Sequence, residues 1–156
     1  MFDSMDEERP TASEPAVRRS RSLFEKHGLR ATRQRIGLAK LLFSKGNRHV
    51  TADALAVEAH AARMTASLAT VYNVLNLFAQ VGLIRSLAIE GTKTIFDTNT
   101  SDHGHFFFED TGEVCDIATD EIKFAGDLEP PEGYEIVAVD VVVRLRPKSG
   151  SVPFSA

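Results

Sequence analysis

Hydrophobic and polar positions follow a helical period through much of the first half of the chain. Residues 20–27 form the first predicted helix, which ends at Gly28, and Thr32 is placed to cap a second helix that runs towards Gly46. Thr51 can cap a third helix that extends to about residue 61. Ser67 can cap a fourth, which Gly82 terminates. Its apolar residues recur every three or four positions and form one stripe of Leu68, Val71, Val74, Leu75, Phe78 and Val81.

Strand-like patterns begin after this fourth helix. Residues 83–89 and 92–97 have the composition of strands, and Glu90 and Gly91 between them predict a two-residue hairpin turn. A helix, a short turn, a second helix and a hairpin follow one another in a winged helix-turn-helix, whose second helix enters the major groove of DNA. The pattern therefore predicts a DNA-binding domain in which the hairpin is the wing.

The last third of the chain predicts a second domain. Residues 134–146 alternate as a long half-buried strand does, and such a strand can form a dimer sheet; its apolar face carries Val137, Val139, Val141, Val143 and Leu145. We expect an α+β protein with a winged helix-turn-helix domain at residues 17–97 and a small α/β dimerisation and sensor domain at residues 98–147. Residues 1–16 are expected to be a disordered tail and residues 148–156 a flexible one.

Charge is divided unevenly between these two parts. Residues 17–85 contain 12 lysines and arginines against three acids, a net charge of +9, whereas residues 86–147 contain four bases against 14 acids, a net charge of −10. A basic region gains affinity for nucleic acid by displacing counterions from phosphates, and an acidic region supplies carboxylates for cations. The charge pattern predicts a DNA-binding half followed by a cation-binding half.

Composition narrows the class of protein further. No apolar run approaches the roughly 18 residues that a membrane span needs, and the start of the chain lacks the order of a secretory signal, so we expect a cytoplasmic protein without a membrane partner. The single cysteine, Cys115, permits neither an internal disulfide nor a CxxC zinc site. We expect Cys115 to be a small core residue.

Polar residues on the fourth helix predict how DNA would be read. Asparagine and glutamine can pair with an adenine edge and small or aromatic apolar groups can touch a thymine methyl, which favours AT-rich operators. The DNA-contacting residues expected on this helix are Ser67, Ala69, Thr70, Tyr72, Asn73 and Asn76. Basic residues are placed to grip phosphates or the minor groove, namely Arg30, Arg33, Arg35 and Lys93. A polar helix face of this kind can also be simply solvated.

Two histidines in a strand-like segment predict a cation site. His103 and His105 would point to the same face of a strand, and a four-residue turn at residues 109–112 would place Asp116 opposite His105. Nitrogen and oxygen ligands without sulfur suit Zn, Fe(II) or Mn(II), and imidazole is also an axial ligand of haem iron. Two surface histidines without a ligand are the alternative interpretation.

These features together resemble the ferric uptake regulator family from residue 28 to residue 145. Residues 29–35 (LRATRQR) look like the start of that family's first motif helix, and residues 67–76 (SLATVYNVLN) look like its recognition helix. HVTAD at residues 49–53, KTIFD at residues 93–97 and the His-x-His segment follow in family order. GTKTIFDTN at residues 91–99 and PEGYEI at residues 131–136 resemble the iron response regulator (Irr) branch, which controls iron and haem genes.

The resemblance implies a homodimer on an AT-rich inverted repeat of double-stranded DNA, with one divalent Zn, Mn or Fe ion per subunit at an inter-domain site. The implied ligands are His49, Asp97, His103, His105 and Asp116. It also implies haem as a second effector, with His103 and His105 as its ligands and a haem-delivering enzyme as a candidate partner. Whether the effector switches DNA binding on or off stays open, because most family members bind DNA when loaded with metal and the Irr branch typically binds when iron is scarce.

Several positions depart from the family pattern. Phe108 and Thr111 stand where the first CxxC pair of the structural zinc site would fall, so no four-cysteine zinc site is expected. Lys123 and Val139 stand near positions that a second metal site would need, and Gly104 interrupts the histidine cluster that some Irr-like proteins use for haem. One principal metal site is therefore expected.

Other functions compete with an Irr-like regulator. The nearest is a metal- or peroxide-responsive repressor of the same family that uses Mn, Zn or Fe. A second, from another class, is a mononuclear hydrolase or oxygenase in which His103, His105 and Asp116 form a facial triad, although no general base or nucleophile motif accompanies them. A third is a cofactor-carrying adaptor without affinity for DNA.

Overall fold

The fold is described from a computed structural model, which covers residues 16–118, 121–123, 125–150 and 152. The disordered tail expected at residues 1–16 lies outside this range except for Ala16, and the tail expected at residues 148–156 lies partly outside it. The chain divides into two compact units. The first unit contains the chain up to Leu87 together with Ile95–Asn99. The second contains Ala88–Thr94 and the chain from Thr100 onwards.

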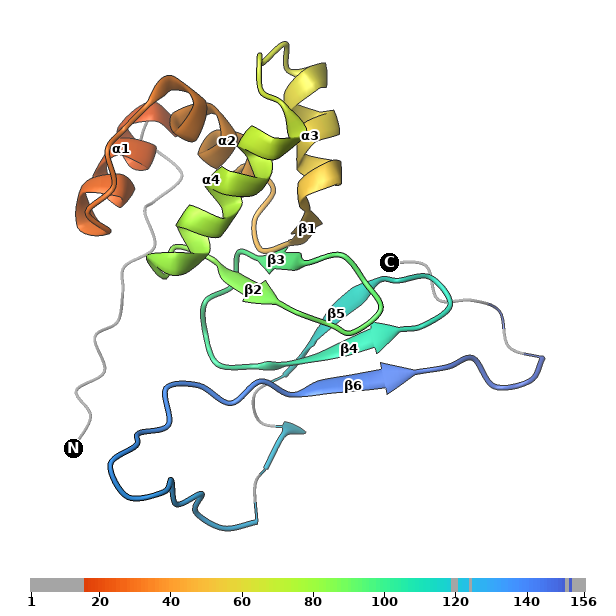
Figure 1. Ribbon diagram of the computed structural model, residues 1–156. Helices are drawn as coiled ribbons and strands as arrows, with labels where there is room; N and C mark the ends of the chain where they lie inside the picture. Colours follow the sequence, from red (N-terminus) through yellow and green to blue (C-terminus); the bar gives the residue numbers. More distant parts are fainter. Residues whose placement is uncertain (1–15, 119–120, 124, 151, 153–156) are drawn as a thin grey trace. The chain divides into compact units, whose positions relative to one another are not determined.

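Among its described residues, the first unit contains four helices and a small antiparallel sheet (Figure 1). The helices are α1 (Ala16–Lys26), α2 (Arg33–Phe43), α3 (Ala52–Ala61) and α4 (Leu68–Gln80). The strands are β1 (His49–Thr51), β2 (Arg85–Leu87) and β3 (Ile95–Asp97), in the order β1-β3-β2. The helix-turn-helix pair is α3 and α4, and the wing strands are β2 and β3.

The side chains predicted to cap three of these helices do so. Thr32, Thr51 and Ser67 have extended backbones, and their hydroxyl oxygens accept hydrogen bonds from backbone amides three residues later, at 3.3, 3.2 and 3.1 Å. Each bond satisfies one of the amides that a helix leaves without an internal partner at its start. The starts of these three helices could therefore be predicted from the local sequence.

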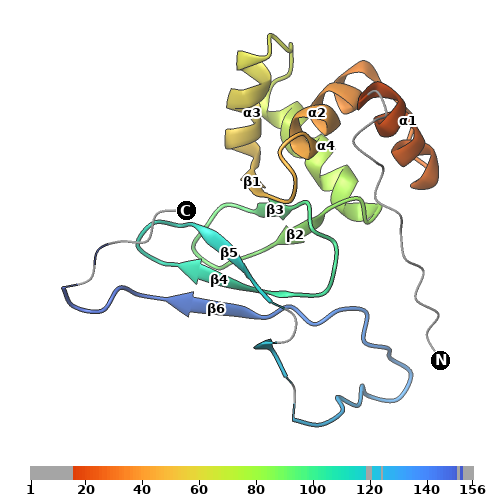
Figure 2. The same cartoon turned by 180° about the vertical axis from the view of Figure 1, so that it is seen from behind.

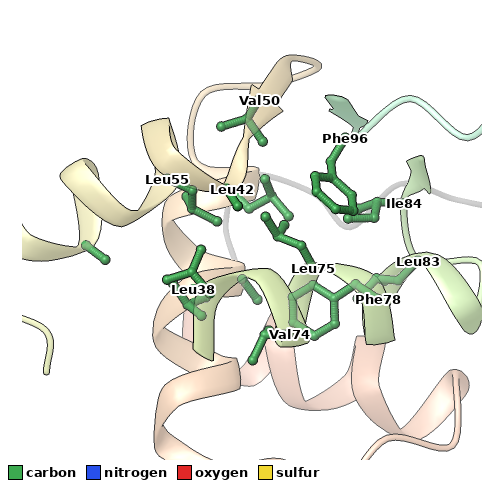
Figure 3. Close-up of a cluster of buried hydrophobic side chains, with 14 of the residues drawn as sticks. Leu38, Leu42, Val50, Leu55, Val74, Leu75, Phe78, Leu83, Ile84 and Phe96 are labelled. Carbon is green, nitrogen blue, oxygen red and sulfur yellow. The ribbon is translucent and has the colours of Figure 1, made fainter. Parts of the chain in front are cut away.

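One apolar core holds the helices of the first unit to its sheet (Figure 3). Phe24 of α1 lies against Phe78 of α4, with ring centroids 5.5 Å apart, and both rings are fully buried. The rest of the core includes Leu38, Leu42, Leu55, Val71, Leu75, Ile84 and Phe96. Leu68 was predicted to belong to the buried stripe of α4 and is half exposed, at 49%. That prediction was wrong, because the core begins one turn later, at Val71.

The wing is a hairpin with a longer tip than its sequence predicted. Arg85 pairs with Asp97 and Leu87 with Ile95, so the strand pairing stops three residues before Glu90 and the two-residue turn does not continue the strands. The turn lies where it was expected, since the Thr92 amide donates to the Ile89 carbonyl at 3.1 Å and Gly91 has a φ of +82°. Glycine tolerates this backbone conformation without a steric penalty.

In the second unit, the strands described are β4 (Gly104–Phe108), β5 (Val114–Ile117) and β6 (Val142–Leu145). β4 is the central strand, antiparallel to β5 and parallel to β6, as Figure 2 shows from behind. The predicted turn and register of β4 and β5 are confirmed, because Phe108 donates to the Glu113 carbonyl and His105 pairs with Asp116.

The long strand predicted at residues 134–146 is wrong in extent. Only Val142–Leu145 forms a strand, and residues 131–140 are exposed, including Val137 at 88% and Tyr134 at 76%. Alternating apolar residues indicate a face that something covers, and nothing within one copy of the described chain covers this one. Within the described residues, no helix combines the length and the apolar character that crossing a membrane requires.

Candidate metal site and DNA-binding surface

In the first unit, a histidine and an aspartate face each other on neighbouring strands. His49 of β1 pairs directly with Asp97 of β3, which places both side chains on one side of the sheet, and His49 Nε2 lies 3.4 Å from Asp97 Oδ2. Asp97 is 1% exposed, and its Oδ1 accepts a hydrogen bond from the Asn99 amide at 2.8 Å. A carboxylate this deeply buried requires compensation by donors or a cation.

The next residues along the two strands hold this pair in register. The Arg48 amide donates to Thr98 Oγ1 at 2.8 Å, and the Thr98 amide donates back to the Arg48 carbonyl at 3.1 Å. The Arg48 guanidinium forms two hydrogen bonds to the carboxylate of Glu58 on α3, and these contacts raise the pKa of Arg48 and lower that of Glu58. Neither Arg48 nor Glu58 was predicted from the sequence to support a site.

In the second unit, two histidines and an aspartate converge on the hairpin of β4 and β5. His103 Nε2 and His105 Nε2 lie 3.2 and 3.6 Å from the same oxygen of Asp116, and the two ring centroids are 4.5 Å apart. One ligand atom from each of the three residues lies within 4.8 Å of those of the others. The His103 and His105 side chains are 3% and 1% exposed, and that of Asp116 is 36% exposed.

A backbone contact orients His103 for this arrangement. Its Nδ1 lies 2.7 Å from the Ser101 carbonyl, which can only accept, so Nδ1 carries the proton and donates. In the neutral ring, the lone pair is then on Nε2, facing Asp116. The lone pair of His103 Nε2 and the negative charge of Asp116 repel each other unless a proton or a cation lies between them. The donor set therefore fits a divalent cation with nitrogen and oxygen ligands.

Cysteine takes no part in this site. Cys115 is half-buried on β5, and burial, together with the negative charges of Glu113 and Asp116, raises the pKa of its thiol. The thiolate that binds metals is therefore disfavoured at neutral pH. Cys115 was expected to be a small core residue, but it is only half-buried and is not among the buried residues of the core.

The N-terminal half of α4 presents the polar residues expected to read DNA. Ser67, Ala69, Tyr72 and Asn73 are exposed, and Thr70 and Asn76 are half-buried. The Tyr72 ring packs nearly perpendicular to that of Phe96 on β3, at 78° with centroids 6.4 Å apart, and Tyr72 is 44% exposed. The face thus offers amide and apolar groups from one rigid helix.

The basic residues expected to bind phosphates differ in their exposure to solvent. Arg30 and Arg33 are exposed near the start of α2, and Lys93 is exposed in the wing loop. Arg35 is half-buried, and its Nη1 donates to the Arg30 carbonyl at 2.9 Å, so part of its role is to shape this loop. Gln34, which sequence reasoning missed, donates to the Thr65 carbonyl at 3.1 Å and ties α2 to the turn before α4.

Comparisons with known proteins decide the family. The model of the ferric uptake regulator family matches residues 26–144. The chain belongs to this family. It is 31% identical over 129 residues to the ferric uptake regulation protein of Pseudomonas aeruginosa, covering 81% of this chain and 96% of the relative. It is 32% identical over 94 residues to the peroxide-responsive repressor PerR of Staphylococcus epidermidis, covering 60% and 62%.

A solved structure supports the same assignment at the level of the fold. The ferric uptake regulator of P. aeruginosa with manganese superposes with a TM-score of 0.66 at 28% identity, covering 83% of this chain and 98% of that one. The predicted fold class of this ferric uptake regulator family member is confirmed. Its relatives are named as regulators, namely a ferric uptake regulation protein and a peroxide-responsive repressor.

Proposed function

We propose that this protein is an Irr-like, metal-responsive transcription regulator that binds AT-rich inverted-repeat DNA as a dimer and controls iron and haem genes. The observation that carries the proposal is the convergence of His103, His105 and Asp116 on one hairpin. Two buried imidazoles beside a carboxylate are expensive to maintain in a core unless they bind a cation.

The family resemblance implies that one divalent ion per subunit would be bound by ligands from both units. The second unit offers three ligands and the first offers two, His49 and Asp97, whereas zinc takes four ligands and octahedral metals take six. The family resemblance unites all five residues in one inter-domain site. When bound, the ion would offset the carboxylate charges and favour the arrangement of the units that satisfies all ligands. His49 and Asp97 would then connect the ion to the sheet that carries the wing.

Burial of the imidazoles favours a small ion over haem at this position. Haem requires access to the face of its iron, and the His103 and His105 side chains are at most 3% exposed. Gly104 adds to this, because a Cβ at this position would collide with the δ-methyl of Ile122. A third histidine there would force Ile122 to move. A haem response through His103 and His105, with delivery by a haem-handling enzyme, therefore fits these buried imidazoles less well than binding of a small ion does.

The exposed and half-buried polar residues of α4 support DNA as the partner. Asn73 and Asn76 would pair with adenine edges, Ala69 and Tyr72 would touch thymine methyl groups, and Ser67 and Thr70 would lie near the backbone. Arg30, Arg33, Arg35 and Lys93 would bind phosphates or the minor groove. The exposed apolar residues around Val137 and Val139 would be covered by a second copy of the chain, which suits a two-fold operator.

A second candidate is a manganese- or peroxide-responsive repressor of the same family. It is favoured by the similarity to PerR and by the manganese in the solved P. aeruginosa structure. The Irr assignment rests on residues 91–99 and 131–136, which the family match does not distinguish. As a regulator of genes, the protein would act in the cytoplasm. A metal enzyme is disfavoured because the relatives are regulators.

The experiment is a fluorescence anisotropy titration of an AT-rich inverted-repeat duplex with purified protein, without effector, with Mn(II) or Fe(II), and with haem. A scrambled duplex of equal composition is the control for non-specific binding. Affinity that changes with metal supports the proposal and reveals its direction, and a change with haem alone favours the haem arm. Absence of duplex binding under all three conditions would refute it.

A further inference from the structure

An arginine of the second unit contacts the tip of the wing. Residues Ala88–Thr94 group with the second unit, although the wing strands on either side belong to the first. Arg144 of β6 donates from Nη2 to the Glu90 carbonyl in the turn of this loop, at 2.9 Å. A backbone carbonyl in a tight turn has a fixed direction, so this bond specifies where the turn lies on the sheet.

Arg144 is itself held in place by two further contacts. Its guanidinium carbon lies 5.5 Å from the centroid of the Phe107 ring, within the range of a cation–π interaction, and its Nη1 lies 3.5 Å from Glu109 Oε1. The side chain is 41% exposed, so each contact alone contributes little. Three contacts from one planar group nevertheless define its orientation, which a lysine could not reproduce.

The same residue is next to the strand that carries the histidines. Phe107 and Arg144 are paired in the parallel register of β4 and β6, and His105 pairs with Val142 two residues earlier. Because side chains alternate along a strand, His105 and Phe107 share one face of β4. A ligand that orders His105 therefore acts on the strand whose Phe107 ring supports Arg144.

We propose that Arg144 is a positioning residue that anchors the wing loop to the sensor sheet and transmits the occupancy of the His103, His105 and Asp116 site to the wing. This inference rests on the proposed function. Lys93, which we expect to contact DNA, lies in the anchored loop three residues after Glu90. Loss of the anchor would leave metal binding intact and weaken its effect on DNA affinity.

The test compares R144Q with R146Q. Arg146 pairs with the same carboxylate, Glu109, through Nε at 3.0 Å and is 83% exposed. Both variants lose one positive charge from β6 or its end, so non-specific electrostatic effects on DNA are matched. The readouts are Mn(II) affinity without DNA, duplex affinity with and without Mn(II), and hydrogen exchange of amides 88–94.

Allosteric coupling between two sites typically changes affinity by about five- to 150-fold, and we expect wild type to lie in this range. In R144Q the ratio of duplex affinities with and without Mn(II) should fall to less than a third of the wild-type ratio, with Mn(II) affinity within about threefold of wild type. The Thr92 amide should exchange at least about fivefold faster in R144Q, because opening of its turn is no longer opposed. R146Q should match wild type in all three readouts.

Equal coupling and equal exchange in R144Q and R146Q would overturn the inference while leaving the proposed function standing. Faster exchange with unchanged coupling would show an anchor that transmits nothing, and would also overturn it. A wild-type protein whose duplex affinity ignores Mn(II), Fe(II) and haem would refute the proposed function, and with it any role of Arg144 in transmission.

Discussion

Replacing Glu58 by glutamine should destabilise the first unit by removing a charged partner without changing the volume of the side chain. Arg48, which directly precedes β1, and Glu58 of α3 form two hydrogen bonds, with side chains only 17% and 23% exposed. Exposed ion pairs contribute about 0–1 kcal/mol, and breaking a fully buried pair costs about 3–5 kcal/mol. The exposure of this pair lies between these cases. We therefore expect a loss of about 1–2 kcal/mol in the free energy of unfolding.

The pH dependence of this loss provides a second test. The hydrogen bond from Arg48 is the largest cause that lowers the pKa of Glu58 in the folded protein. A carboxyl group with a lowered pKa stabilises the fold above its unfolded pKa of about 4.3, and this contribution disappears as the pH falls through the folded value. The difference between wild type and E58Q should be constant from pH 7 to about pH 5 and should shrink at lower pH.

Urea denaturation of the metal-free protein at several pH values measures both effects. Lys45 offers a matched control, because its Nζ lies 3.3 Å from Glu58 Oε1 but the side chain is 60% exposed. K45Q should change the free energy of unfolding by less than about 0.5 kcal/mol. The reasoning is refuted if E58Q is as stable as wild type at pH 7, or if its deficit does not shrink as the carboxyl group of wild type becomes protonated.

Three further predictions concern DNA reading, metal binding and the core. Asn73→Ala should weaken binding to the AT-rich duplex by about tenfold, as expected for one lost adenine contact, with unchanged Mn(II) uptake; an unchanged duplex affinity in anisotropy measurements would reject the role of α4. His103→Ala with His105→Ala should abolish Mn(II) uptake measured by calorimetry and preserve the circular dichroism spectrum, so uptake by the double variant would place the site elsewhere. Phe78→Ala, which empties a fully buried site, should cost about 3–5 kcal/mol in urea denaturation, and a loss under 1 kcal/mol would contradict the core assignment.

Local signals in the sequence were sufficient to predict the helices and the turn of the sensor hairpin. Thr32, Thr51 and Ser67 cap helices because a hydroxyl three residues before a backbone amide can reach it without any tertiary contact. The pairing of His105 with Asp116 could be predicted from the length of the turn at residues 109–112 and from the two-residue period of side chains along a strand. Such predictions succeed because the interacting residues are close in sequence.

Features that depend on distant residues were not predicted. Arg48 lies in the loop before β1 and Glu58 lies on α3, ten positions later, at a spacing that no single helix or strand brings together. The strand expected at residues 134–146 shows the same limit, because alternation indicates that a face is covered without specifying what covers it. The prediction that residues 83–89 and 92–97 would pair up to a two-residue turn was wrong for a related reason. Residues 88–94 contact the second unit instead of continuing the pairing of β2 and β3.

Control of DNA binding by one metal site on His and Asp ligands can be measured by titrating the AT-rich duplex with wild-type protein and with the His103→Ala, His105→Ala variant at increasing Mn(II) or Fe(II). Metal should change the duplex affinity of wild type by at least about fivefold and leave that of the variant unchanged. An identical metal response in both proteins would contradict this prediction.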